Sequence, residues 1–234
     1  DTVEVLDKLD LSQSKSKLLA IVANTRGAND GAQYEKITYL GYPHSISNTF
    51  LQRNINSSLE KSRNTMEEIM DICVKKNKIL TVYLSMGFGN PYGEEWRVEQ
   101  IEDETAILHE IGVKRIVLSD TVGMGSPERI EKSFEKLVPL YPDVQFGLHL
   151  HTTLEHWCKK LDAAFKHGCR SFEGVINGIG GCPMAGYELV GNIRTGLLLQ
   201  YLRKNKVETD IDKEAFENAI TKSITTFALL KYKS

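Results

Sequence analysis

Short apolar runs alternate with longer amphipathic stretches along the whole chain. The runs are almost continuously apolar, which is typical of parallel strands that are covered on both faces. They predict strands at Leu18–Ala23, Ile37–Leu40, Ile79–Leu84, Arg115–Leu118, Val144–Leu150 and Ser171–Ile176. The stretches between them carry apolar side chains at the spacing of a helix that packs one face against a core.

Helices are predicted wherever this amphipathic spacing persists. Ser126 and Pro127 mark one start, because serine is a favoured N-cap and proline is favoured at the first helical position. The predicted helices are Thr2–Leu9, Ser57–Lys76, Arg97–Ile111, Pro127–Leu140, Thr152–His167, Tyr187–Arg203 and Asp210–Tyr232. The repeated order of strand and helix predicts an α/β protein with a parallel sheet.

Two parallel architectures fit this order: an open doubly wound sheet and a (β/α)8 TIM barrel. The first strand is not followed by a glycine-rich dinucleotide fingerprint and the chain has no P-loop, so nucleotide-binding forms of the open sheet are disfavoured. Polar side chains follow the apolar runs directly, at the strand ends where barrel enzymes carry their chemistry, and this favours the barrel. They are Asn24, Arg26, Tyr83, Ser85, Ser119, Asp120, His149, His151 and Asn177.

The number of predicted strands falls short of the eight that a (β/α)8 barrel requires. Because Thr2–Leu9 looks like the end of a helix, we expect about two β/α units upstream of Asp1 to be absent. Residues 1–234 are then expected to form a single, N-terminally incomplete barrel domain. Residues 213–234 are expected to form a C-terminal helix that closes the domain.

Composition limits the class of partner. Lysine and arginine total 29 and aspartate and glutamate total 31, so the net charge of −2 gives no reason to expect nucleic-acid binding. No apolar run approaches the roughly 20 residues of a membrane span. The cysteines, at positions 73, 158, 169 and 182, form no C-x-x-C pair, and we expect free thiols in a reducing, cytoplasmic compartment. A homodimer is left open.

His149 and His151 form the strongest local signal. Residues i and i+2 of a strand point to the same face, about 6 to 7 Å apart, so both imidazoles can bind one divalent ion. The alternative is that hydrogen bonds alone satisfy these two side chains at the mouth of the barrel. Spacing by itself leaves both interpretations open.

Two glycine-containing loops carry further candidates. Cys182 lies in the loop Asn177-Gly178-Ile179-Gly180-Gly181-Cys182-Pro183, where a thiol can act as an acid, a base or a nucleophile. Asp120 ends a predicted strand and precedes a loop and a helix start, which suits a polar catalytic group. The structural alternatives are an incidental small residue for Cys182 and a loop or cap residue for Asp120.

Together these motifs resemble those of 3-hydroxy-3-methylglutaryl-CoA lyases, which belong to a metal-dependent barrel superfamily that also holds isopropylmalate and homocitrate synthases. The resemblance runs from about Leu18 to the end of the chain. The interval from His149 to Cys182 also agrees with the family pattern. The segments that carry the resemblance are 50–58, 83–92, 119–127, 149–151, 178–183 and 191–192.

The resemblance implies a metal-dependent carbon–carbon lyase that cleaves a 3-hydroxyacyl-CoA by a retro-aldol reaction. An example is the cleavage of 3-hydroxy-3-methylglutaryl-CoA to acetoacetate and acetyl-CoA, with Mg²⁺ or Mn²⁺ as the cofactor; a related hydroxy acid is a further substrate class. The implied metal ligands are His149, His151 and Asn192. Cys182 would be the catalytic thiol and Asp120 a polar group beside the metal. The implied substrate-binding residues are Tyr83, Ser85, Asn24 and Asn54.

Several positions depart from the family pattern. Thr152 follows the two histidines where aspartate or asparagine is usual. The spacing from Cys182 to Asn192 is one residue longer, and 194–196 read Arg-Thr-Gly in place of A-T-E. The family's fourth metal ligand, an aspartate in an R-D-G strand, has no counterpart.

These departures keep two alternatives open. The first is a synthase that condenses acetyl-CoA with a 2-oxo acid, favoured by Asn177-Gly178 and disfavoured by the Cys182 loop. The second is a non-catalytic barrel with a decayed site, favoured by Thr152 and Gly196. The joint presence of both histidines, Cys182 and Asn192 argues against decay.

Overall fold

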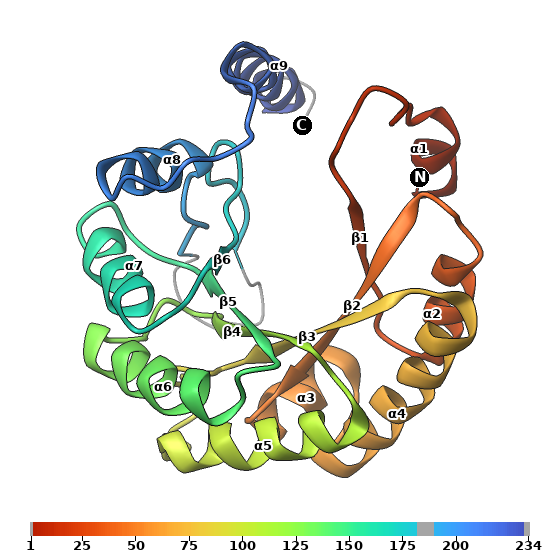
Figure 1. Cartoon of the computed structure of the whole chain (residues 1–234), viewed down its shortest axis with the longest axis vertical. Coiled ribbons are helices and arrows are strands. Elements are labelled where there is room, and N and C mark those ends of the chain that lie inside the picture. The colour runs from red at the N-terminus through yellow and green to blue at the C-terminus, as the bar shows by residue number, and fades with distance from the viewer. Residues whose placement is uncertain (1, 182–189, 232–234) are drawn as a thin grey trace.

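A parallel sheet forms the centre of the computed structural model, which describes residues 2–181 and 190–231. Within these residues, six strands lie in the sheet in chain order, and each neighbouring pair is parallel. They are β1 (Leu18–Ile21), β2 (Ile37–Ser45), β3 (Ile79–Ser85), β4 (Arg115–Asp120), β5 (Gln145–Leu150) and β6 (Ser171–Phe172). Figure 1 shows the sheet curving into an open arc between β1 and β6, with helices around its outside. The predicted α/β class with a barrel-type parallel sheet is confirmed as a half-barrel.

Most helices of the described residues lie around the outer face of this arc, and the last one stands beside its open side (Figure 1). The helices are α1 (Thr2–Lys8), α2 (Thr25–Ala32), α3 (Asn48–Ile55), α4 (Leu59–Lys76), α5 (Val98–Ile111), α6 (Pro127–Leu140), α7 (Trp157–Lys166), α8 (Thr195–Lys204) and α9 (Lys213–Lys231). In the described part of the chain, no helix combines the length and the apolar character that crossing a bilayer requires.

The core lies between the strands and these outer helices. Successive side chains of a strand point to opposite faces of the sheet, and alternate residues such as Val82 and Ile116 are fully buried in one apolar cluster. Met66 of α4 and Phe134 of α6 belong to the same cluster. Each large apolar side chain buried in this way contributes about 1.5–3 kcal/mol to stability. The side chains at the other strand positions point to the concave face of the sheet, where several of them are polar.

Two strands differ most in length from the prediction. β2 continues past Leu40 to Ser45, because its polar end finds buried partners: the ring of His44 bonds the Ser62 hydroxyl at 2.8 Å and the Glu104 carboxylate at 3.0 Å. β6 contains only two residues, and the predicted continuation to Ile176 is wrong. Beyond β6, Val175 forms an isolated parallel bridge with Arg194.

The helices α2 and α3 were not predicted. Both are eight residues long, and each is fixed by a polar cap that apolar periodicity does not reveal. The Asn24 side chain accepts a hydrogen bond from the Gly27 N–H at 2.9 Å, and the Ser47 hydroxyl accepts one from the Phe50 N–H at 3.1 Å.

Two predicted helix starts were too early. α8 begins at Thr195, because residues 190–194 form an extended segment that pairs with the end of β5 and with Val175. α7 begins at Trp157 in place of Thr152, whose N–H instead donates to the Gly191 carbonyl oxygen at 2.9 Å. Both corrections have the same cause, because backbone hydrogen bonds hold these two segments in non-helical conformations.

Candidate functional site

His149 and His151 face each other at the carboxyl end of β5. The register of the sheet places His149 beside Ser119 of β4, and the two imidazoles project from the same side of the chain. Their Nε2 atoms are 3.2 Å apart and their ring centroids 5.1 Å apart. His151 is buried, whereas the His149 side chain is 27% exposed, so the pair can be reached from outside.

The other ring nitrogen of each histidine is already bonded. His149 Nδ1 donates to Glu173 Oε2 at 2.8 Å, and His151 Nδ1 donates to the Val190 carbonyl oxygen at 2.8 Å. Carboxylate and carbonyl oxygens only accept hydrogen bonds, so in the neutral rings the proton sits on Nδ1 and Nε2 keeps its lone pair. Burial lowers the pKa of His151, helped by the nearby His149, and this favours the neutral form.

Two opposed lone pairs are the feature that fits a cation. They repel each other at 3.2 Å, and a divalent ion between them would satisfy both. Adjacent ligands of an octahedral ion, each roughly 2.1 Å from the metal, lie roughly 3 Å apart. Among the described residues no third His, Cys, Asp or Glu completes a cluster, so any further ligand from this part of the chain must be of another type.

Asn192 supplies such a group. It pairs with His151 in an isolated antiparallel bridge, which brings the segment 190–194 against the end of β5. Its Nδ2 donates to the Ile179 carbonyl oxygen at 3.0 Å, and this bond orients the amide while its Oδ1 keeps its lone pairs. Two imidazoles and an amide oxygen are ligands that divalent metals accept, so the residues present fit the implied cofactor.

Glu173 is a functional candidate that sequence reasoning missed. The ladder between β5 and β6 pairs Leu148 with Phe172. The next residues after this pair are His149 on one side and Glu173 on the other. Tyr83 of β3 donates its hydroxyl hydrogen to Glu173 Oε1 at 2.7 Å, while Oε2 accepts from His149. Burial, together with the charge of Glu173, raises the pKa of Tyr83, so its hydroxyl stays protonated and able to donate. A carboxylate directly after the neighbouring strand was the available signal.

Replacing Glu173 by glutamine is expected to weaken metal binding by roughly 10- to 100-fold, because a partner that orients a metal-ligating histidine also makes it a stronger ligand. Titration calorimetry with Mn²⁺ on the full protein measures this. The exposed Glu208→Gln is the matched control and should bind like the wild type. Equal affinities for Glu173→Gln and the control would refute the orienting role.

Asp120 lies on the helix side of β4, with the alternating residues Ile116 and Leu118. Its Oδ2 accepts a hydrogen bond from Lys160 Nζ at 2.6 Å, and its Oδ1 accepts one from the Gly125 N–H at 2.9 Å. The Lys160 and Asp120 side chains are only 5% and 0% exposed. Both carboxylate oxygens therefore hold the fold around the loop after β4, and Asp120 acts on His151 through its charge, which opposes the lowering of the pKa of that histidine.

The remaining predicted site residues are not gathered at the histidine pair. Asn24 caps α2 and Asn54 is exposed on α3, and among the described contacts neither bonds to a histidine. Ser85 is buried, and its carbonyl oxygen accepts hydrogen bonds from β2. Cys182 lies outside the described residues. Tyr83, by contrast, contacts His149 edge-on, with ring centroids 6.3 Å apart.

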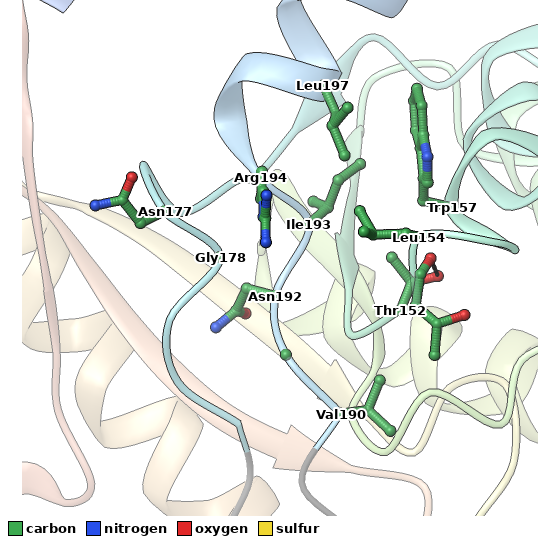
Figure 2. Close-up of a pocket in the computed structure, with 12 residues that line it drawn as sticks. Thr152, Leu154, Trp157, Asn177, Gly178, Val190, Asn192, Ile193, Arg194 and Leu197 are labelled. Atoms are coloured by element: carbon green, nitrogen blue, oxygen red, sulfur yellow. Dashed lines mark hydrogen bonds between the residues drawn. The ribbon is translucent and has the colours of Figure 1, made fainter. Parts of the chain in front are cut away.

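A cavity of about 290 Å³ lies beside these groups (Figure 2). The loop after β5, with Thr152, Leu154 and Trp157, forms one side, and the segment 190–194 forms the other. Of the predicted metal ligands, Asn192 lines the cavity and the two histidines do not. Its mixed polar and apolar lining suits a small organic ligand.

Comparisons with known proteins show which proteins this chain resembles in sequence and in fold. The hydroxymethylglutaryl-CoA lyase YngG of Bacillus subtilis is 29% identical over 222 residues, which are 94% of this chain and 72% of that protein. The crystal structure of the Bacillus subtilis HMG-CoA lyase superposes with a TM-score of 0.89 at 27% identity, covering all of this chain and 80% of the other. An HMG-CoA lyase from Acinetobacter baumannii in complex with coenzyme A and 3-methylmalate has a TM-score of 0.85 at 24% identity, over 94% of this chain and 71% of that one.

The share of a relative's length that this chain covers differs from one relative to another. The chain spans about half the length of the vertebrate cytoplasmic lyases that it also matches. The HMGL-like family model, however, matches residues 11–221, and this range contains the whole sheet, both histidines and Asn192. The chain therefore belongs to the HMGL-like family.

Proposed function

We propose that this protein is a divalent-metal-dependent carbon–carbon lyase that cleaves a 3-hydroxyacyl-CoA, with 3-hydroxy-3-methylglutaryl-CoA as the first candidate substrate. Acetoacetate and acetyl-CoA are the products of that cleavage. The observation that carries the proposal is the opposed pair of Nε2 atoms of His149 and His151, 3.2 Å apart, on two rings whose Nδ1 atoms are already bonded to oxygen atoms. Membership of a family whose relatives include hydroxymethylglutaryl-CoA lyases supports the reaction class.

Some residues of this chain would bind the metal, and others orient the metal-binding side chains. His149, His151 and the amide oxygen of Asn192 would hold Mg²⁺ or Mn²⁺, which when bound polarises the oxygen atoms of a hydroxy acid. Glu173 and the Val190 carbonyl oxygen keep both imidazoles in the tautomer that leaves Nε2 free. Tyr83 in turn keeps the Glu173 carboxylate in place by donating to it.

The retro-aldol step requires two proton transfers. A base removes the proton of the substrate hydroxyl, the carbon–carbon bond breaks, and its electrons pass to the thioester as an enolate, which then gains a proton at carbon. We assign this second proton to the thiol of Cys182, on the basis of its glycine-rich sequence motif. Asp120, which is bonded to Lys160, is proposed to act only through its charge, which opposes the lowering of the pKa of His151.

The half-barrel is proposed to be part of a complete (β/α)8 barrel, because β1 and β6 stand at the two ends of the sheet without pairing to each other. The helix α9 is proposed to close the domain on one side. Its Ser223 hydroxyl accepts a hydrogen bond from Asn177 Nδ2 at 2.7 Å, which ties α9 to the loop after β6.

The test is an assay of acetoacetate after incubation of the full-length protein with 3-hydroxy-3-methylglutaryl-CoA and Mg²⁺ or Mn²⁺. We expect product that disappears when a chelator removes the metal and returns when metal is added in excess. Bound metal without product would reject this substrate. Failure to bind either metal would reject the metal-dependent lyase and favour the decayed barrel.

A further inference from the structure

Arg194 is a cation placed beside the predicted metal ligand Asn192. The two residues are separated by one position in an extended segment, and both lie against the glycine-rich stretch that follows β6. A Cβ atom at Gly178 would come within 2.8 Å of Arg194 Cγ, and one at Gly180 would come within 3.1 Å of Asn192 Nδ2. Figure 2 shows the two side chains next to each other beside Gly178.

The positive charge of Arg194 is unpaired within residues 2–181 and 190–231. No carboxylate there forms an ion pair with its guanidinium, and no hydrogen-bond acceptor receives its protons. The residue is exposed, and it lines the same cavity of about 290 Å³ as Asn192. Arg63, by contrast, is paired with Glu104.

The space beside Arg194 is open at the neighbouring residue Gly196. A side chain at Gly196 would meet no atom within 4 Å, so this position leaves room for a ligand group. The start of α8 lies here as well, and helix N-termini favour anions.

We propose that Arg194 is a specificity-determining residue that binds an anionic oxygen group of the substrate. Carboxylates and phosphates each present a pair of oxygen atoms that a planar guanidinium contacts with two hydrogen bonds. In an acyl-CoA this group is either a carboxylate of the acyl part or a phosphate of coenzyme A. The inference rests on the proposed function and adds the recognition of substrate charge by a residue outside the predicted metal ligands.

The test compares Arg194→Ala and Arg194→Lys with the wild type in the full-length protein. Arg194→Ala is expected to raise KM for the acyl-CoA roughly 10- to 100-fold while kcat changes far less, because a charged hydrogen-bond partner is lost from binding. Arg194→Lys should recover part of the loss. Arg203→Ala, at the other end of α8, removes an equal charge from an exposed position and should behave like the wild type.

The same variants tell the two anions apart when the acyl-CoA is replaced by the acyl-pantetheine thioester, which lacks the nucleotide phosphates. If KM of Arg194→Ala rises for both thioesters, the acyl carboxylate is the ligand. If it rises only for the acyl-CoA, a phosphate is the ligand. An unchanged KM for both would overturn the proposal.

Calorimetry tests the anion site independently of the proposed lyase activity. The probes are free coenzyme A and 3-hydroxy-3-methylglutarate, each titrated in the presence of Mn²⁺. Weaker binding of either probe to Arg194→Ala than to Arg203→Ala supports the anion site even if no lyase turnover is found. Equal binding of both probes to the two variants, with turnover intact, overturns the anion site and leaves the lyase standing.

Discussion

Replacing His149 by alanine is expected to abolish metal-dependent cleavage while the protein remains folded. The change removes one of the two opposed Nε2 atoms, so the chelate that two adjacent ligands form is lost. His149 lies on the concave face and is partly exposed, so its removal leaves the core between strands and helices intact. Acetoacetate formation and Mn²⁺ binding should both fall below detection, with an unchanged melting temperature.

His156→Ala is the matched control for this experiment. His156 lies in the loop before α7, its side chain is 67% exposed, and it forms an ion-pair contact with the neighbouring Glu155 at 4.0 Å. We expect this variant to bind Mn²⁺ and to turn over like the wild type. Metal binding by His149→Ala at wild-type affinity would show that the histidines are held by hydrogen bonds alone, which is the structural interpretation of the H-x-H motif.

The parts of the fold that the sequence predicted depend on local patterns. Apolar periodicity located the six strands, and Ser126 and Pro127 predicted the start of α6, where the Ser126 hydroxyl accepts a hydrogen bond from the Arg129 N–H. The two-residue period of a strand placed His149 and His151 on one side, which the facing rings confirm. Short-range geometry of this kind is encoded by adjacent residues.

The parts that were missed depend on contacts between distant residues. Glu173 reaches His149 across 24 positions and Tyr83 across 90, and only the strand register brings them together. The extended segment that carries Asn192 was predicted as helix, because its backbone partner, the end of β5, lies far away in the chain. The sequence therefore predicted the candidate ligands but not the groups that orient them.

The position of Asp120 at a strand end was predicted from the sequence, but the partner of its carboxylate was not. Its place at a strand end suggested a catalytic group, whereas the structure pairs its carboxylate with Lys160 of α7, 40 residues away. Alternation along β4 directs the side chain toward the helices, and a lysine inside an amphipathic helix gives no sign that it is buried. Function and stability therefore need separate tests at this position.

Replacing Lys160 by methionine is expected to destabilise the protein by about 3–5 kcal/mol, because it leaves the charge of Asp120 buried without its ionic partner. Lys160 Nζ also donates to the Gly123 carbonyl oxygen at 2.9 Å, so the loop after β4 loses a second contact. Thermal or urea unfolding measures the change. The exposed neighbour Lys159→Met makes the same substitution at the surface and should stay within about 0.5 kcal/mol of the wild type.

A double variant then shows whether the loss comes from the unpaired charge. In Lys160→Met with Asp120→Asn the buried charge is gone, while an asparagine oxygen can still accept the Gly125 N–H. If the unpaired charge is the main cost, this double variant should be more stable than Lys160→Met alone, and the two single effects should not add. A Lys160→Met protein as stable as Lys159→Met would instead mean that the pair contributes little to the fold. Asp120 would then be retained chiefly for its electrostatic action on His151.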